Sequence, residues 1–256
     1  MSREEQTNVL KAENLKKRYG RRFAVNGVNI QVSSGQIIGL LGRNGAGKTT
    51  TFQIIIGLLK SNEGTISLNN LNISQYSTHQ RAKIGITYLP QENSVFLKTS
   101  VEKNLKMIMQ LQGQKKTVQK DTVRELLDEL ALQPLAKQSS HSLSGGERRK
   151  LEICRSLIIK PKFLLLDEPF TGIDPLTIKE LQKILLKLKN QGIGIVISDH
   201  NVRDTLKITD YAYIIDEGKI LVEGKPEMIA LDEKAKTKFL GHKFKLGDRI
   251  RICEPD

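Results

Sequence analysis

The chain has 256 residues, 38% of them hydrophobic and 27% charged, which is enough to bury the core of one large domain or two small ones. No stretch approaches the ~18 consecutive apolar residues of a membrane-spanning helix, and the N-terminus lacks the apolar core of a signal peptide, so we expect a cytoplasmic protein. The 41 basic residues outnumber the 28 acidic ones by 13, but no basic stripe with interleaved aromatics accompanies them, so solvated lysines or a membrane surface account for the charge better than nucleic acid.

The start of the chain predicts antiparallel strands. Residues 9–15 alternate loosely between apolar and polar side chains, and residues 28–32 alternate strictly before a Ser33-Ser34-Gly35 turn. Tyr19 lies between these segments. A tyrosine ahead of a phosphate-binding loop can stack on a purine ring, although an isolated tyrosine is also typical of a half-buried strand position.

Residues 42–49 match the phosphate-binding motif G-x-x-x-x-G-K-S/T. A buried strand is expected over 36–41 and a helix from Lys48, which is the context that the motif requires. Lys48 would place a cation beside the β- and γ-phosphates of a nucleotide, and the Thr49 hydroxyl would bind Mg²⁺. Backbone N–H groups and the helix N-terminus would surround the anion, because three small residues let the backbone approach it: Gly42, Gly45 and Gly47. We therefore predict a nucleotide site and not an empty glycine turn.

Short strands are expected next, over 64–68 and 84–89. The pattern then becomes all-helical from about residue 92 to 160. Residues Thr99–Glu102 have the form of a capping box that opens one amphipathic helix, and a second is expected over 117–130. Cys154 falls in a later helix of this region and Cys253 near the chain end. Their spacing fits neither a metal site nor a redox site, so both are expected to be reduced thiols.

The second half of the chain alternates strands with helices. Strands are predicted over 163–167, 193–198 and 211–215, and helices over 175–190 and 201–208, with a hairpin closing at 216–223. Continuous apolar strands that alternate with helices are typical of a mostly parallel sheet covered on both faces. The sequence therefore predicts an α/β fold.

Two further motifs carry polar chemistry. Asp167 and Glu168 end a buried strand, where α/β sheets bind ligands. Asp167 suits the outer coordination sphere of Mg²⁺ and Glu168 suits a general base for the attacking water, although an acidic pair after a strand also commonly caps a helix. Residues 142–147, Ser-Leu-Ser-Gly-Gly-Glu, precede a long helix. They fit either a helix N-cap or a second anion site, which two chains arranged head to tail would need.

These motifs, in this order, resemble the ATP-binding subunits of ABC transporters over nearly the whole chain. The resemblance implies a P-loop NTPase (RecA-like) core with an N-terminal antiparallel β subdomain and an inserted α-helical signature subdomain. It divides a single nucleotide-binding domain into a catalytic core (1–91 and 161–240), a helical subdomain (92–160) and a tail (241–256).

The resemblance also implies roles for single residues. Tyr19 would stack on adenine, and Glu168, His200 and Gln91 would be catalytic. Mg²⁺ would be held by Thr49, Gln91 and Asp167. The phosphates of ATP would be bound by the loop residues Gly42, Arg43, Asn44, Gly45, Ala46, Gly47, Lys48, Thr49 and Thr50. A second chain would complete the site with Ser144, Gly145, Gly146, Glu147 and Asp174. Arg43 departs from the family, where proline is common at this position.

Four segments resemble the ATPase of the lipopolysaccharide export system of Gram-negative bacteria: 89–96, 142–149, 167–175 and 199–206. That resemblance implies a homodimer, bound to two polytopic inner-membrane permease subunits on the cytoplasmic face. Phe96 would lie in the groove that receives a membrane subunit, and its alternative is an ordinary core aromatic.

Three alternatives to lipopolysaccharide export remain. Branched-chain amino-acid importer ATPases are the nearest confusable group. A nucleic-acid-acting ABC protein is disfavoured because the chain has no second cassette, zinc insertion or long coiled coil, and an inactive scaffold is disfavoured because Lys48, Glu168 and His200 are all present. Residues 247–256 extend past the family's usual end and are expected to be frayed or loosely docked.

Overall fold

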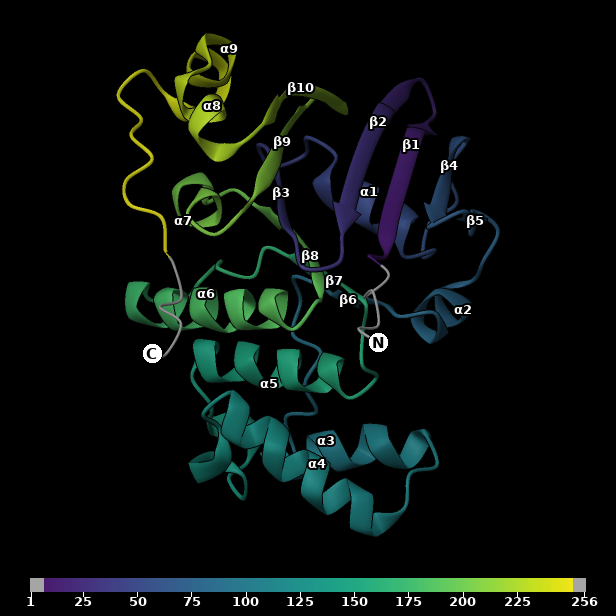
Figure 1. The fold of residues 1–256 in the computed structure, drawn as a ribbon, viewed down its shortest axis with the longest axis vertical. Helices are drawn as coiled ribbons and strands as arrows, with labels where there is room; N and C mark the ends of the chain where they lie inside the picture. The colour runs from purple at the N-terminus through teal and green to yellow at the C-terminus, as the bar shows by residue number, and fades with distance from the viewer. Residues whose placement is uncertain (1–6, 251–256) are drawn as a thin grey trace, which may run out of the picture.

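The fold is described for residues 7–250 of a computed structural model (Figure 1). Its centre is a six-stranded sheet in the order β10-β9-β3-β8-β7-β6. The strands are β3 (Ile37–Leu41), β6 (Ile86–Leu89), β7 (Phe163–Asp167), β8 (Gly194–Asp199), β9 (Tyr211–Asp216) and β10 (Lys219–Gly224). All neighbours pair in parallel except β9 and β10, which form the predicted hairpin.

The inner strands β3, β7 and β8 are almost continuously apolar because both faces of the sheet are covered there. Leu164 and Leu166 of β7 point into a core shared with α5 (Gly145–Leu157) and α6 (Pro175–Asn190). Leu165 points into a second core, which contains Phe52 of α1 (Lys48–Ile55). Successive strand residues thus serve opposite faces, which is the physical reason for the unbroken apolar run.

A second sheet packs against α1 and shares the core that contains Phe52 with the six-stranded sheet. Its order is β2-β1-β4-β5, and every pair is antiparallel. The strands are β1 (Val9–Tyr19), β2 (Arg22–Ser33), β4 (Glu63–Leu68) and β5 (Leu71–Asn72). The first two are longer than predicted, since their outer halves are partly exposed and carry little apolar alternation.

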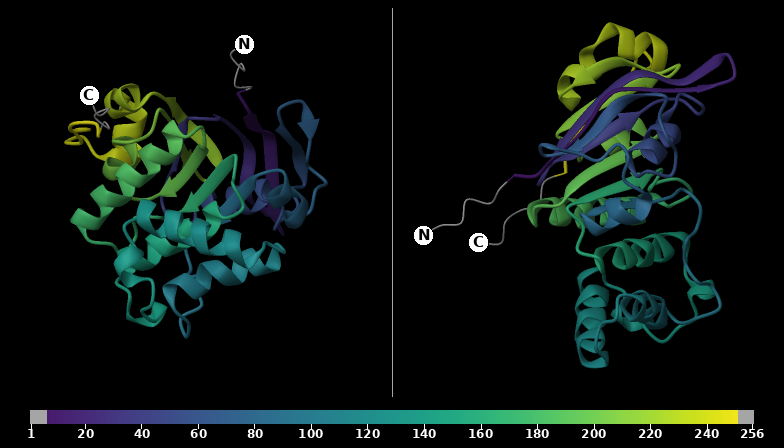
Figure 2. Two further views of the ribbon diagram at one scale, coloured as in Figure 1. Left: turned by 60° about the horizontal axis from the view of Figure 1, so that its bottom comes forward. Right: turned by 90° about the vertical axis from the view of Figure 1, so that its right-hand side faces the viewer.

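The helices α3 (Val101–Leu111) and α4 (Lys116–Glu129) pack with α5 into a unit that extends away from both sheets (Figure 2). The prediction of a capping box at Thr99 was wrong. Ser100 is the N-cap, and its side chain accepts the backbone N–H of Lys103. The backbone of Thr99 is occupied elsewhere, since its carbonyl accepts the N–H of Ser140.

Some short elements were not predicted. Helix α2 (Thr78–Lys83) begins with a capping box between Ser77 and Gln80. Its C-cap is Ile84 and Gly85 has φ +100°, so the strand expected over 84–89 begins only at Ile86. Helix α7 (Val202–Leu206) is shorter than expected. After β10 come α8 (Pro226–Leu231), α9 (Glu233–Ala235) and a π-helical turn over Lys236–Leu240. Among residues 7–250, no helix combines the length and hydropathy needed to span a bilayer.

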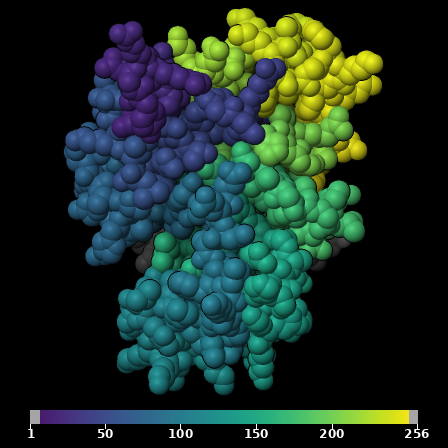
Figure 3. All heavy atoms as spheres, turned by 180° about the vertical axis from the view of Figure 1, so that it is seen from behind, coloured from purple at the N-terminus to yellow at the C-terminus, as the bar shows by residue number. Residues whose placement is uncertain are grey.

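The chain end lies against the body of the molecule as far as residue 250. In the view from behind, the yellow C-terminal residues cover one upper corner, and the teal helical unit forms the lower part (Figure 3). Arg249 forms an ion pair with Glu227 of α8 at 3.0 Å, and the N–H of Ile250 donates to the Lys207 carbonyl at 3.3 Å. Arg249 and Ile250 are therefore docked, whereas residues 251–256 of the predicted tail, Cys253 among them, lie outside the described residues.

A buried arginine fixes the end of α1. Arg81 is 2% exposed, and its guanidinium donates to the carbonyls of Ile54 at 2.7 Å and Ile55 at 2.6 Å. It also donates to the Ser74 carbonyl at 2.9 Å and the Tyr76 carbonyl at 3.0 Å. A helix end and a loop leave carbonyls short of regular partners, and this one cation donates to four of them. The Ile54 carbonyl also accepts the N–H of Gly57 at 3.1 Å.

We expect Arg81→Met to lower the free energy of unfolding by about 3 kcal/mol, because it leaves buried carbonyls unpaired. The matched control is Lys83→Met, which changes an exposed cation of the same helix and should shift stability by less than about 0.5 kcal/mol. Urea denaturation of both variants measures the difference. Equal stabilities would contradict the capping role of Arg81.

Candidate functional site

The phosphate-binding loop joins β3 to α1 and is tightly enclosed. A Cβ atom at Gly42 would lie 2.4 Å from the Ile215 carbonyl oxygen, and one at Gly47 would lie 2.4 Å from that of Ala24. Gly47 also has φ +111° and is the N-cap of α1. Neighbouring backbone, not only ligand chemistry, therefore demands glycine at both positions.

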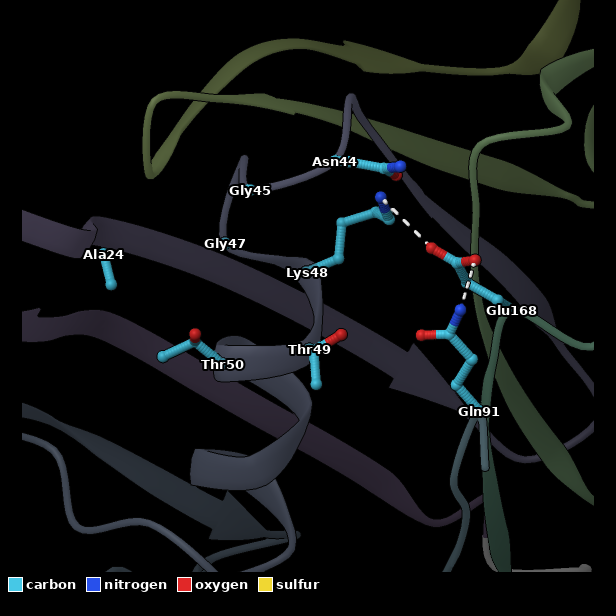
Figure 4. A pocket seen from close by; sticks show the side chains of 9 residues that line it. All are labelled: Ala24, Asn44, Gly45, Gly47, Lys48, Thr49, Thr50, Gln91 and Glu168. Atoms are coloured by element: carbon cyan, nitrogen blue, oxygen red, sulfur yellow. Dashed lines mark hydrogen bonds and ion pairs between the residues drawn. The ribbon is translucent and has the colours of Figure 1, made fainter. Parts of the chain in front are cut away.

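Lys48 is held inward by the loop itself. Its side chain is buried, and Nζ donates to the carbonyls of Gly42 at 2.8 Å and Arg43 at 3.2 Å. The ammonium lies 3.8 Å from Oε1 of Glu168. Figure 4 shows this side chain reaching across the pocket toward the carboxylate. A cation in this position faces whatever anion enters the loop.

The loop borders a pocket of about 250 Å³. Its lining residues are Ala24, Asn44, Gly45, Gly47, Lys48, Thr49, Thr50, Gln91 and Glu168 (Figure 4). The structure thus brings most of the predicted loop residues together with Gln91 and Glu168. Ala24 of β2 was missed because an alanine in a strand carries no chemical signal.

Glu168 is where several segments meet. Its backbone is left-handed, with φ +46°, and its N–H donates to the Ser198 carbonyl at 2.8 Å. The carboxylate accepts hydrogen bonds from Gln91 Nε2 and Thr171 Oγ1, both at 3.1 Å. His200 Nδ1 lies 3.3 Å from the same oxygen. The three predicted catalytic residues Glu168, Gln91 and His200 therefore share one point.

Asp167 lies behind this point and is fully buried. Its carboxylate accepts hydrogen bonds from the Tyr88 hydroxyl at 3.1 Å and from the Ser198 hydroxyl. Burial, and next the Asp167 charge, raise the pKa of Tyr88, so the phenol stays protonated and donates. Neither hydroxyl was predicted, although both residues occupy strands that neighbour β7 in the sheet.

The oxygen donors near the loop suit Mg²⁺. Among residues 7–250, no three carboxylate, histidine or thiol side chains gather into a metal cage. Mg²⁺ is usually held by one or two protein oxygens together with phosphates and water. The Thr49 hydroxyl and the Gln91 amide fit that description, since both residues line the pocket and offer hard oxygens. Asp167 is fully buried and accepts two hydroxyls, so its carboxylate fits only the outer coordination sphere.

The segment 142–147 lies outside the loop pocket, although Gly145 lines a separate cavity of about 280 Å³ together with Gln91 and Glu168. Ser144 is the exposed N-cap of α5, in a capping box with Glu147. A Cβ at Gly146 would lie 2.0 Å from Thr177 Cγ2, so the starts of α5 and α6 are pressed together. Asp174 caps α6, and its hydrogen bonds from Thr177 lower its pKa. No residue of 142–147 lines the loop pocket.

Seven other predicted residues are absent from the pocket lining: Tyr19, Gly42, Arg43, Ala46, Phe96, Asp167 and His200. Tyr19 is 54% exposed at the end of β1, with Lys17 Nζ 5.5 Å from its ring. Arg43 points outward, and its guanidinium donates to the Lys238 carbonyl at 2.6 Å. Phe96 is 48% exposed beneath the Arg155 guanidinium, 5.0 Å from its ring centre. The alternative that Phe96 is a core aromatic was wrong.

The loop that carries Phe96 is bound to α5. Ser94 N–H donates to Glu152 Oε1 at 2.7 Å, and Glu152 pairs with Arg149 at 2.9 Å. Arg149 also donates to the carbonyls of Pro90 at 3.0 Å and Asp167 at 2.8 Å. A continuous set of contacts therefore runs from the exposed aromatic to the acidic end of β7.

Comparisons with known proteins agree on the family. A family model described as ABC transporter matches residues 25–171. The lipopolysaccharide export system ATP-binding protein LptB of Haemophilus influenzae is 44% identical over 240 residues, covering 93% of this chain and 100% of that protein. LptB of Escherichia coli K12 is 44% identical over 93% of this chain and 99% of its own. The ADP conformation of an ATP-binding cassette of an ABC transporter is similar with a TM-score of 0.82 at 28% identity, over 92% of this chain and 99% of that one.

Proposed function

The chain belongs to the ABC transporter family of ATPases, and from that premise we propose that it is the motor subunit that drives lipopolysaccharide export from the inner membrane. The observation that carries the proposal is the 44% identity to export ATPases across their full length. Lys48, Gln91 and Glu168 line one pocket and His200 contacts the Glu168 carboxylate, which supports ATP hydrolysis by this chain.

The pocket suits hydrolysis of a terminal phosphate. The loop N–H groups and Lys48 would bind the phosphates, because they supply positive potential where the anion must lie. Bound Mg²⁺ would neutralise charge on the phosphate oxygens, held by Thr49 and Gln91 with Asp167 in the outer coordination sphere. Glu168 would take the proton from the attacking water, and Gln91 and His200 orient its carboxylate through the contacts described above.

A second copy would complete each site. Ser144, Gly145 and Asp174 are exposed and lie outside the loop pocket of their own chain, whereas Gly146 is buried beside Thr177. A head-to-tail homodimer would place the start of one α5 against the ATP bound by the other chain's Lys48 loop. The helix dipole and free N–H groups at that start favour an anion. The Ser144 hydroxyl already caps α5 in this arrangement, so both readings of the motif apply together.

The exposed aromatic supports a peripheral position on the membrane. We infer that the Phe96 loop of each motor chain binds one polytopic permease subunit on the cytoplasmic face of the inner membrane. The homodimer would therefore bind two such subunits. A ring covered by one guanidinium and otherwise open is an anchor suited to a partner's apolar side chain. An amino-acid importer would use the same surface, so the identity of the membrane proteins decides between these functions.

Glu168→Gln should retain ATP binding, lower the hydrolysis rate at least about 100-fold and accumulate dimer, because the amide cannot accept the proton of water. Light scattering with ATP and a phosphate-release assay measure these properties. The control is Glu92→Gln, which makes the same change at an exposed acid outside the pocket lining. Wild-type hydrolysis by the Glu168 variant would remove this residue from catalysis.

Lys48→Ala and Ser144→Arg should fail at different steps. The first should abolish ATP binding by the isolated chain, since it removes the cation of the pocket. The second should leave ATP binding within about twofold of wild type, since Ser144 lies outside the pocket. It should block dimer closure, since the arginine would occupy the space of the ATP bound by the partner chain. Fluorescent-nucleotide titration and sedimentation separate the two. Equal loss of ATP binding would contradict a site shared between chains.

Phe96→Ala should reduce the recovery of the membrane subunits with the motor chain at least about tenfold, because a central aromatic anchor is lost. Phe23→Ala, at an exposed aromatic of β2, is the matched control. Mass spectrometry of the purified complex identifies the subunits. Recovery of an amino-acid permease in place of lipopolysaccharide-export proteins would overturn the proposed cargo.

A further inference from the structure

The C-terminal segment, defined here as residues 236–250, contacts the phosphate-binding loop at one end. Arg43 of the loop donates from its guanidinium to the Lys238 carbonyl at 2.6 Å. Lys238 itself lies 3.8 Å from Asp216 at the end of β9. Because the carbonyl of Arg43 accepts a hydrogen bond from Lys48, the residue that reaches the C-terminal segment also helps to position the pocket's cation.

The other end of the same segment holds helix α7, which begins two residues after His200. The ring of Phe244 lies 5.9 Å from the guanidinium of Arg203 in that helix. The N–H of Ile250 donates to the carbonyl of Lys207, where α7 ends. Arg249 donates to the Thr209 carbonyl and pairs with Glu227, so the segment joins α7 to α8.

An apolar core connects these two ends. Leu41, the residue before Gly42, and Leu206 of α7 belong to one buried cluster. The C-terminal segment packs four side chains against that cluster: Phe239, Leu240, Phe244 and Leu246. Because packed side chains transmit displacement, the strand that enters the phosphate loop and the helix that follows His200 rest on a common support.

We propose that the C-terminal segment is a brace that fixes the phosphate-binding loop and the His200-bearing turn relative to each other, with Arg43 and Arg249 as its positioning residues. This inference rests on the proposed ATPase site. It explains why a bulky cation occupies a loop otherwise built of small residues, since Arg43 spans to the segment and not to the pocket. It also assigns a role to the contacts that Arg249 and Ile250 make with the end of α7 and with α8.

An ordinary packed chain end would behave differently from a brace. In ordinary packing, loss of a contact loosens only the residues around it, and distant substitutions add. In a brace, loss of the contact at either end also loosens the other end. The double substitution should therefore have no larger effect than a single one. The distinction is measurable because Arg43 and Arg249 contact different parts of the segment.

The experiment compares Arg43→Ala, Arg249→Ala and the double variant with Lys245→Ala, an exposed cation of the same segment. Hydrogen exchange followed by mass spectrometry is the readout that does not require activity. Arg249→Ala should raise exchange in residues 43–47, and Arg43→Ala should raise it in residues 202–207, with β7 unchanged. Changes confined to each variant's own end, or equal changes everywhere, would overturn the brace.

Kinetics supply the second arm. Each single variant should lower kcat about three- to tenfold with the KM for ATP within about twofold, and the double variant should match the worse single. Multiplied losses in the double variant would contradict one shared element. Absence of hydrolysis by the wild-type chain would instead refute the proposed function, and the exchange results would still decide on the brace.

Discussion

The carboxylate of Glu168 is the constraint on which the site depends, because it is the one group that Lys48, Gln91, Thr171 and His200 all approach. Its left-handed backbone turns the chain sharply at the end of β7. A non-glycine residue in that conformation carries strain, which the hydrogen bond from its N–H to the Ser198 carbonyl offsets. The strained backbone conformation therefore has a structural role, because it directs the carboxylate across the edge of the sheet.

The sheet register makes this convergence possible. Leu41 of β3 pairs with Asp199 of β8, and Asp167 of β7 pairs with Ser198 of β8. The three strands thus end at the same level, so the phosphate loop, the acidic pair and His200 emerge side by side. A shift by one residue would turn Leu165 and Leu166 to the wrong cores and move Asp167 out of its hydroxyl pair.

The sequence predicts best those elements whose residue pattern can be explained by a single structural requirement, such as burial or helix capping. Strand β7 and helix α6 have the predicted bounds, because burial on both faces and a clear N-cap each leave a plain signal. Helix α2 was missed, since six residues with one buried side chain show no periodicity. The hydroxyls of Tyr88 and Ser198 were missed because their role arises from strand pairing. The contact of Arg43 joins residues 195 positions apart, which no local pattern can indicate.

The buried ion pair Arg149–Glu152 contributes more to the positioning of neighbouring backbone groups than to the stability of the fold. Removing two charges from water costs more than their attraction commonly returns, so an apolar pair would fold at least as well. Yet Arg149 also binds the carbonyls of Pro90 and Asp167, and Glu152 binds the N–H of Ser94. An apolar pair could not hold those three backbone groups in place. The pair therefore fixes the distance between the loop that exposes Phe96 and the strand end that carries Glu168, which the proposed coupling of ATP hydrolysis to membrane partners requires.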